Sequence, residues 1–334
     1  MNRIGRFFSR FCLAALLLGW GFGGTVSAGE FPDKPVTIVI PWPAGTIPDI
    51  AFRILGELAR EDLGQPVVVT NVVGGSGTKG TISVKNAAPD GYTLLNNWVA
   101  PHVVAPLFNP DVGYSDKDFE PLMGVLINPF TVTVAIGHPA NNLKEFVAWA
   151  KAEQKKRTLN VGICAALSVP RMVMEEFLIV AGITNYNGVP YPGCMPDNVK
   201  GLLDGSLDFT TGVIIAEKTF SGLVKNLAIF SDTRFANASH IPTAKEQGYD
   251  IRWGKTAYGW AGLVAPAGTP QDRLDKLNRV LGKWVQSAEF KRRMDKQGVQ
   301  VDYIPTKEFV ELWHSSRKIL KPAVDRILAA KKKS

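Results

Sequence analysis

Short β-branched runs alternate with segments of helical periodicity along most of this chain, and this alternation limits the possible folds more than any other feature. Val36–Ile40 is an apolar run typical of a buried strand, and Ile50–Leu63 carries apolar residues at helical spacing. Further strands are expected at Pro66–Val73 and Tyr92–Leu95, with a helix at Thr81–Ala88 between them. Because short connections join these elements, they predict a parallel sheet covered by helices, and therefore an α/β protein.

The same alternation restarts further along the chain. The additional elements expected from periodicity are strands at Thr131–Ile136 and Leu159–Gly162 and helices at Leu143–Lys155, Arg171–Ala181 and Val199–Leu203. Near the C-terminus, Thr269 and Pro270 predict the N-cap and the first residue of a helix. Thr306–Ile319 predicts a last amphipathic helix, which Pro322 is expected to kink or interrupt. Two series of elements indicate two α/β lobes.

Length and composition agree with a folded protein rather than a disordered or fibrous one. The 334 residues suffice for one large or two medium domains, and 46% apolar residues can supply a sizeable core. The formal net charge is +8, but Arg3, Arg6 and Arg10 near the start and the run Lys331–Lys333 at the end carry most of it. The body of the chain shows no basic stripe, which argues against a nucleic-acid partner.

Residues 1–28 have the three parts of a secretory signal peptide. Met1–Phe11 is basic, Cys12–Leu18 is a short apolar run, and Val26–Ala28 is a small-residue cleavage pattern. The apolar run is shorter than the roughly 20 residues that span a bilayer, and a membrane anchor is the alternative. We therefore expect residues 1–28 to be cleaved, so that the mature chain begins near Gly29 in the periplasm.

Export makes a disulfide between the two remaining cysteines, Cys164 and Cys194, chemically allowed. Their spacing does not show whether the two Cα atoms come within bridging distance, so the bridged and the reduced forms both stay open. The four histidines are far apart, and no H-x-x-x-H or C-x-x-C spacing occurs. Neither a metal nor another cofactor is expected.

Glycine-containing loops follow the first two strands, at the edge of a parallel sheet where ligands of α/β proteins bind. The first loop, Pro41–Asp49, leads into a helix whose N-terminal N–H groups favour an anion. In the second loop Gly75, Gly77 and Gly80 match the dinucleotide pattern G-x-G-x-x-G, but no acidic residue follows about 20 positions later. A tight strand-to-helix turn or an anion-binding loop explains this match better than a nucleotide site does.

Motifs for catalysis are missing from the sequence, which has no G-x-S-x-G elbow, no H-E-x-x-H and no acid pair at short spacing. Asp49 as a general base competes with a simpler role as a helix cap. Cys164 as a nucleophile lies in an apolar stretch with no histidine nearby. We therefore expect a protein that is not an enzyme, and the alternative is an exported α/β enzyme that uses Asp49 or Cys164.

Several runs of residues form an ordered series along nearly the whole mature chain. They are Phe31–Pro35, the Pro-Trp-Pro-x-Gly loop that ends at Asp49, Leu63–Val69, Ala88–Leu95, Val189–Tyr191, Leu202–Gly205 and Leu263–Pro270. In this order the runs resemble the Bug family, the periplasmic solute-binding components of tripartite tricarboxylate transporters. The resemblance implies an α/β, bilobal type II periplasmic binding-protein fold, with mostly parallel sheets and a ligand cleft between two lobes. Lobe 1 would comprise residues 29–128 and 258–334, and lobe 2 residues 129–257.

The resemblance also implies a small carboxylate in the cleft, held largely by backbone groups and waters from loops of both lobes. Transferred to this sequence, the ligand-binding residues would come from the loop after each of several strands. They are Trp42, Pro43, Ala44, Gly45, Thr46, Asp49, Gly75, Ser76, Gly77, Asn97 and Trp98 in lobe 1, and Cys164, Ala165, Ser168, Arg171 and Tyr191 in lobe 2.

Several positions depart from the family pattern. Family members usually have Pro-Gly-Gly-Gly-Thr before the aspartate at position 49, where this chain has Ala-Gly-Thr-Ile-Pro over Ala44–Pro48, and Asn71–Thr78 and Ile163–Pro170 differ from the usual polar loops. Arg171 stands where a histidine is common, and Gly212 where an aspartate is often found. These changes remove hydroxyl groups and add methyl groups, while Arg171 offers a bidentate partner for a carboxylate.

Aromatic residues gather near the same loops. By the resemblance, the chain would cross between the lobes near Ile127–Thr133 and again near Gly254–Gly262. Trp42 and Trp98 belong to the first-lobe loops, and Trp253, Tyr258 and Trp260 lie near the second crossing. One hypothesis is an aromatic or otherwise apolar carboxylate stacked on these rings, and the alternative is that the rings are ordinary core or rim packing. The departures are also compatible with a ligand that is not an anion.

Together the sequence predicts a monomeric solute-binding protein that closes around a small organic carboxylate and presents it to the membrane permease subunits of a tripartite tricarboxylate-type transporter. Closure of this kind is a hinge motion that ligand shifts by its better contacts in the closed state. Besides the exported enzyme, a ligand-dependent sensor partner of a membrane kinase is an open alternative, because it needs the same closure.

Overall fold

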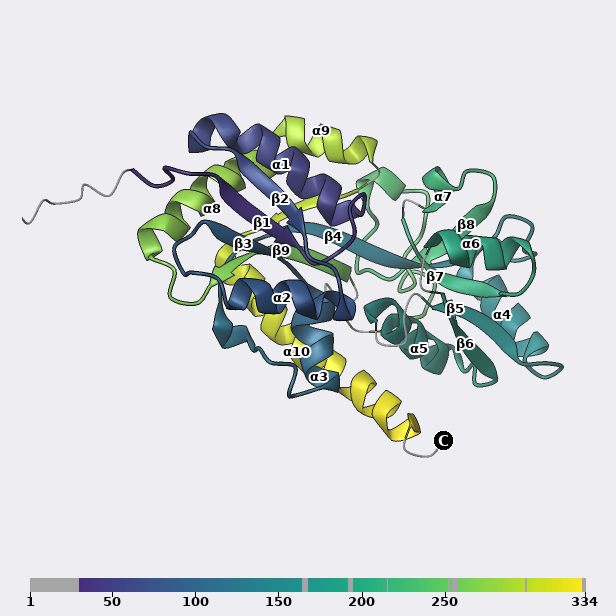
Figure 1. The fold of residues 1–334 in the computed structure, drawn as a ribbon. Coiled ribbons are helices and arrows are strands. Elements are labelled where there is room, and N and C mark those ends of the chain that lie inside the picture. Colours follow the sequence, from purple (N-terminus) through teal and green to yellow (C-terminus); the bar gives the residue numbers. More distant parts are fainter. Residues whose placement is uncertain are drawn as a thin grey trace, which may run out of the picture.

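A computed structural model describes residues 30–163, 168–191, 195–214, 216–251, 253, 258–297 and 299–331 (Figure 1). The strands are β1 (Val36–Ile40), β2 (Val67–Asn71), β3 (Thr93–Trp98), β4 (Phe119–Ala135), β5 (Leu159–Ile163), β6 (Tyr186–Pro190), β7 (Phe209–Val213), β8 (Val224–Ile229), β9 (Tyr258–Pro266) and β10 (Val301–Ile304). The helices are α1 (Ile47–Leu63), α2 (Thr78–Lys85), α3 (Ala105–Phe108), α4 (Leu143–Glu153), α5 (Val169–Ala181), α6 (Met195–Leu203), α7 (Ala216–Thr219), α8 (Gln271–Gln286), α9 (Ala288–Lys296) and α10 (Thr306–Lys331). Short 3-10 turns lie at Gly75–Gly77, Asp116–Asp118 and Ala236–Ala238, and a π-helical turn lies at Ala100–Val104.

Two groups of strands meet along β4, and they give the molecule its two lobes (Figure 1). In lobe 1, β1 pairs in parallel with β2 and β3, and β9 then joins β3 to the first part of β4 by antiparallel pairing. In lobe 2, β5 pairs in parallel with β6 and β7, and the last part of β4 pairs with β7 and β8. The bilobal α/β fold is therefore confirmed, whereas the division into 29–128, 129–257 and 258–334 stays a prediction.

The expectation of mostly parallel sheets is wrong, because the long strands β4 and β9 pair antiparallel. β4 has 17 residues and β9 has nine, and the two run antiparallel from the pair Phe119–Pro266 to the pair Pro129–Tyr258. β4 passes from one lobe to the other and runs antiparallel to each strand that it pairs with. It therefore adds antiparallel pairs to both sheets. The parallel units predicted by the alternation are present, but each sheet is mixed.

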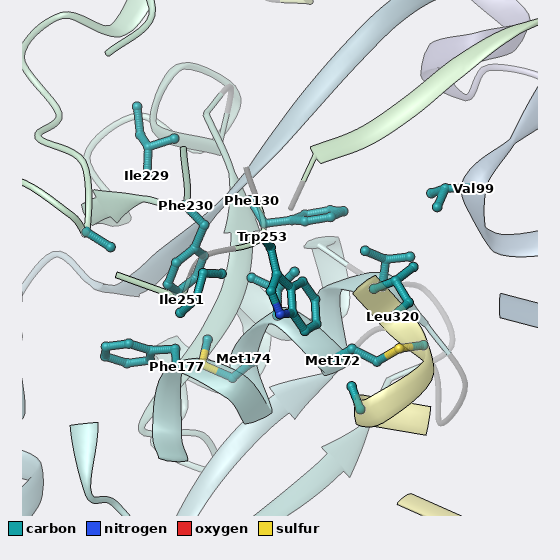
Figure 2. Packing of buried hydrophobic residues seen from close by; sticks show 14 of the residues in the cluster. Val99, Phe130, Met172, Met174, Phe177, Ile229, Phe230, Ile251, Trp253 and Leu320 are labelled. Atoms are coloured by element: carbon teal, nitrogen blue, oxygen red, sulfur yellow. The ribbon is translucent and has the colours of Figure 1, made fainter. Parts of the chain in front are cut away.

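Two apolar layers enclose the sheet of lobe 1, because residues of each strand alternate between its faces. Leu94 of β3 points into a layer with Leu55 of α1 and Leu277 of α8, and its neighbour Leu95 points into the layer beside α2 and α10. The second layer continues into lobe 2, where it includes Phe177 of α5, and Figure 2 shows part of it. Among the described residues, no helix combines the length and the apolar character needed to cross a bilayer.

Three helix ends differ from the sequence-based expectations. Helix α1 begins at Ile47 rather than Ile50, since Pro48 fits the first turn of a helix, where no N–H is needed. Helix α8 begins at Gln271 after Pro270, and the Thr269 hydroxyl donates to the Pro266 carbonyl instead of capping the helix. Helix α10 continues through Pro322.

Candidate functional site

The carboxyl ends of β1, β2 and β3 bring three loops together at one edge of the lobe 1 sheet. Asn71, the last residue of β2, donates from its amide nitrogen to the Trp42 carbonyl and to Asp49 Oδ1, each at 2.9 Å. This one side chain therefore joins the loop after β1 to the end of β2. Ligands of open α/β sheets bind at such an edge. The loops that we expected from the sequence to bind a ligand lie together here, at the carboxyl ends of three strands.

Asp49 holds the loop between β1 and α1 in shape. Its Oδ2 accepts from the Gly45 N–H at 2.8 Å, and its Oδ1 accepts from Arg53 Nε at 3.1 Å as well as from Asn71. Burial, the largest single influence, favours the protonated form, but these hydrogen bonds together outweigh it and keep the pKa of Asp49 below its usual value. With both oxygens engaged, Asp49 is an ionised anchor of the loop, which is a poor arrangement for a general base.

The rest of this loop faces outward. Pro43, Ala44 and Gly45 are exposed, and the Thr46 hydroxyl donates to the Pro43 carbonyl at 2.8 Å. Trp42 is half-buried against the apolar layer under α1, and its Nε1 has no hydrogen-bond partner in the described part of the chain. The loop thus offers backbone and an indole rather than a row of hydroxyl groups.

The loop between β2 and α2 is shaped by its backbone. Residues 74–77 all have positive φ. The φ of Ser76 is 53°, an uncommon value for a residue with a side chain. This turn leaves the N–H groups of Gly75 and Ser76 outside its own hydrogen bonds, directly before the N-terminus of α2. Backbone N–H groups in such a turn form a concave site that suits an anion.

Gly80 explains the rest of the glycine pattern. A Cβ at this position would lie 2.9 Å from both Pro41 Cβ and the Val72 carbonyl oxygen. The third glycine is therefore required for close packing of α2 against β1, and the three glycines need no nucleotide to account for them.

The end of β3 supplies Asn97 and Trp98. Val39 of β1 pairs with Leu95, so continuing the register places Asn97 beside Pro41, close to Gly77 and Gly80. Asn97 is fully buried, and neither its amide oxygen nor its amide nitrogen has a partner among the described residues. A buried amide without partners is costly, so Asn97 is a strong candidate for contact with a polar ligand group. Trp98 is half-buried and packs against both apolar layers.

The lobe 2 residues of the predicted site are placed less completely. Cys164 and Ala165 lie outside the described residues, and so does Cys194, the other half of the considered disulfide. Ser168 caps α5 by accepting from the Arg171 N–H at 3.4 Å. Tyr191 packs against the apolar cluster around α6, and its hydroxyl lies 3.3 Å from Ser206 Oγ.

Arg171 has a carboxylate partner within its own helix. Its Nε donates to Glu175 Oε1 at 2.7 Å, an ion pair between residues four apart on α5. Arg171 also lines a cavity of about 540 Å³ together with Tyr186 of β6 and Ile327 of α10, away from the lobe 1 loops described above. A ligand carboxylate at Arg171 would therefore share the guanidinium with Glu175.

Two of the aromatic residues near the second crossing belong to the core. Trp260 is fully buried, and its Nε1 donates to Ser316 Oγ at 3.0 Å. Trp253 is only 6% exposed and lies inside the cluster that Figure 2 shows. Ordinary packing therefore accounts for these two rings, while Trp42 and Trp98 remain at the loops.

Two residues of the loop network were missed from the sequence. Arg53 and Asn71 hold Asp49, and both have a signal in the sequence: Arg53 follows Asp49 by four helical positions, and Asn71 ends a strand. Metal binding has no support in the part of the chain that the structure describes, where no group of three His, Cys, Asp or Glu side chains could hold an ion.

Comparison with known proteins decides the family. The model of the tripartite tricarboxylate transporter family receptor, TctC, matches residues 51–327 of the chain. The chain belongs to this family. Its resemblance to the Bug proteins is thereby confirmed, because BugT of Bordetella pertussis is 31% identical over 271 residues, which cover 80% of this chain and 81% of BugT.

Solved structures of TctC-type proteins agree with this assignment. The R. palustris protein Rpa4515 with adipate has a TM-score of 0.75 and 25% identity, over 88% of this chain and 98% of that one. MatC from Rhodopseudomonas palustris with bound malate has a TM-score of 0.71 and 25% identity, over 88% of this chain and 100% of that one. Members of the TctC family are periplasmic solute-binding receptors and not enzymes, so the chain is a solute-binding protein and the catalytic alternatives for Asp49 and Cys164 are set aside.

Proposed function

We propose that this TctC-family protein captures a small organic carboxylate between its two lobes and delivers it to the membrane permease subunits of a tripartite tricarboxylate-type transporter. The proposal includes export with a cleaved signal peptide over residues 1–28 and action as a monomer. It rests most on Asn97, whose buried amide lacks partners in the described part of the chain, near the loop between β2 and α2 that offers the N–H groups of Gly75 and Ser76. Relatives of the same fold support the ligand class, since one holds malate and another adipate.

The lobe 1 loops can bind a carboxylate without a charged side chain. The N–H groups of Gly75 and Ser76 and the amide nitrogen of Asn97 are donors, and the N-terminus of α2 adds a partial positive charge. Asp49 repels an anion only weakly, because Arg53 neutralises it and Gly45 and Asn71 solvate it. Binding through neutral donors suits release to a transporter, since no strong ion pair must be broken.

We propose further that the ligand has an apolar or aromatic body. Exposed Ala44 and half-buried Trp42 give the first loop apolar surface beside the donors. An aromatic ring stacked on an indole gains about 0.5–1.5 kcal/mol beyond its buried area. Closure of lobe 2 over this surface, with Ser168 and Tyr191 among the lobe 2 contacts, would complete the site.

The test is thermal unfolding of the mature chain in the presence of malate, adipate, benzoate and their neutral amides. A ligand that binds only the folded state adds about 2.7 kcal/mol at a hundredfold excess over its Kd. We expect the midpoint to rise with benzoate more than with malate, and the rise to disappear in Asn97→Ala and shrink in Trp42→Ala. Trp284→Ala is the matched control, because Trp284 lies on α8 and is bonded to Asp62, away from the loops.

The outcomes separate the parts of the proposal. A rise with malate alone would keep a carboxylate receptor and contradict the apolar ligand. A rise only with neutral amides would contradict the carboxylate itself, and no response of the wild type to any of the three acids would contradict this ligand class.

A further inference from the structure

Helix α10 is a single helix of 26 residues that packs on both lobes (Figure 1). One stripe of buried residues runs along α10 at helical spacing and continues beyond lobe 1 onto lobe 2. The stripe consists of Phe309, Trp313, Ser316, Leu320, Val324 and Ile327, each at most 4% exposed. A helix with a continuous buried stripe is held along its whole length, so α10 connects the lobes independently of the crossing strands β4 and β9.

The first half of α10 is fixed to lobe 1. Phe309 packs so closely on β9 that a Cβ at Gly262 would overlap its ring. Ser316 accepts from Trp260 of β9, and Trp313 Nε1 donates to the His102 carbonyl at 3.4 Å. These contacts join α10 to the sheet and to the turn after β3.

The second half of α10 lies on α5 of lobe 2. Arg326 forms an ion pair with Glu176, and Figure 2 draws Leu320 of α10 in the same apolar cluster as Met172 of α5. Cavities of about 520 and 540 Å³ flank this contact, and Arg326 lines both of them. Arg326 therefore lies beside open space at the contact with α5, whereas Phe309 is closely packed on lobe 1.

Pro322 lies between the two halves. Proline has no N–H, so the Lys318 carbonyl loses its helical partner and the helix can bend there at low cost. Pro322 also lines the 520 Å³ cavity, which gives the chain room to move.

We propose that the end of α10 after Pro322 is a strap between the lobes, and that the pair Arg326–Glu176 sets how far lobe 2 swings from lobe 1. The strap bends at Pro322 when the lobes open and closes through this pair in the arrangement described here. The two side chains are 47% and 21% exposed, so the pair is weak enough to open in water. A weak tether of this kind tunes an equilibrium rather than locking it.

Interlobe distance distributions in the ligand-free protein test the strap. Spin labels on p-acetylphenylalanine at Glu61 of α1 and Lys200 of α6, both exposed positions, leave Cys164 and Cys194 untouched. Arg326→Glu and Glu176→Arg each replace attraction by repulsion, and we expect each to increase the population at longer distances about three- to tenfold. The double variant Arg326→Glu/Glu176→Arg restores the pair and should restore the wild-type distribution.

Lys321→Glu is the control, because it makes the same charge change on α10 but its partner is Asp325 on the same helix. We expect it to leave the distribution unchanged. Wild-type distributions in both single variants would overturn the proposal, and so would a double variant that stays open. Because no ligand is present, the result is independent of the ligand class proposed above.

Discussion

The two loops that form the lobe 1 side of the candidate site are held in shape by different means. The loop between β1 and α1 is held by side chains, since Asp49 collects hydrogen bonds from Gly45, Arg53 and Asn71. The loop between β2 and α2 is held by positive φ angles and by the close approach of Gly80 to Pro41. The first loop should therefore be sensitive to changes of charge and the second loop to changes of side-chain volume. Substitutions of each kind can distinguish the two.

Acid should lower the free energy of unfolding more than any substitution below, and it should act through His102. His102, in the turn that contacts the second loop, packs edge-on against Phe119 and Trp313, and burial lowers its pKa from 6.5 to about 3. The unfolded chain therefore binds a proton that the folded chain refuses. Stability from this residue is fully present above pH 6.5 and is lost as the pH falls toward 3, at up to about 1.4 kcal/mol per pH unit.

Urea unfolding of the wild type and of His102→Gln between pH 7.5 and 4 measures this effect. Glutamine takes up no proton, so the variant should lose less stability on acidification. Parallel curves for the two proteins would show that His102 is charged in the folded state.

Gly80→Ala should destabilise the protein by about 2 kcal/mol, the usual cost of one extra carbon in a packed site. The new Cβ would press on Pro41 and on the Val72 carbonyl, and backbone cannot move aside as a flexible side chain can. Gly137→Ala is the matched control, because no atom lies within 4 Å of its added Cβ. Equal unfolding midpoints for the two variants would contradict packing as the reason for Gly80.

Asp49→Asn should cost about 1–2 kcal/mol, because it removes a charged acceptor from the Gly45 N–H and from Asn71. The folded pKa of Asp49 is lowered, so the contribution of this residue is complete above its ordinary value of 3.8 and is lost only as the pH falls below it. Chemical unfolding at pH 7 and pH 3 measures both. A difference between wild type and variant that is as large at pH 3 as at pH 7 would argue against the charge.

Ser76→Gly should change stability least, with a gain of about 0.5 kcal/mol. Glycine relieves the left-handed φ of 53°, and its greater freedom in the unfolded chain offsets part of that gain. Differential scanning calorimetry can resolve a change of this size. A loss of more than 1 kcal/mol would indicate that the Ser76 hydroxyl stabilises the loop.

Local pattern predicted β1, β2, β3, β5 and most of the longer helices, but it missed β6 to β10 and found only the end of the crossing strand β4. The sequence indicated only Thr131–Ile136 of β4, because Pro121, Gly124 and Pro129 interrupt the pattern before it. In the structure the strand shifts register near Pro121 and Gly124, and pairing with β9 carries it past these residues. Such tolerance depends on a partner far away in the sequence, which a local pattern cannot show.

The candidate site was predictable in its loops and in side-chain pairs four positions apart on one helix, but not in contacts between residues far apart in the sequence. Strand ends and glycines located the loops after β1 and β2, because their geometry is set by neighbouring residues. The pairing of Arg171 with Glu175 also had a local signal, the four-residue spacing along α5. The burial of Trp260 had none, because it depends on Ser316, a residue of the C-terminal helix.

The position of β9 has a consequence for the order in which the chain folds. β3 pairs with β9, so Leu95 has no strand partner on that side until Val264 has been synthesised. The strands β5 to β8 of lobe 2, in contrast, follow one another along the chain. A chain that emerges N-terminus first therefore presents β1 to β3 with an open sheet edge while lobe 2 is already able to assemble. Open edges of this kind recruit other chains, so the interval before β9 arrives is when aggregation threatens most. The lobe whose loops carry the best-described half of the site is the last to be completed.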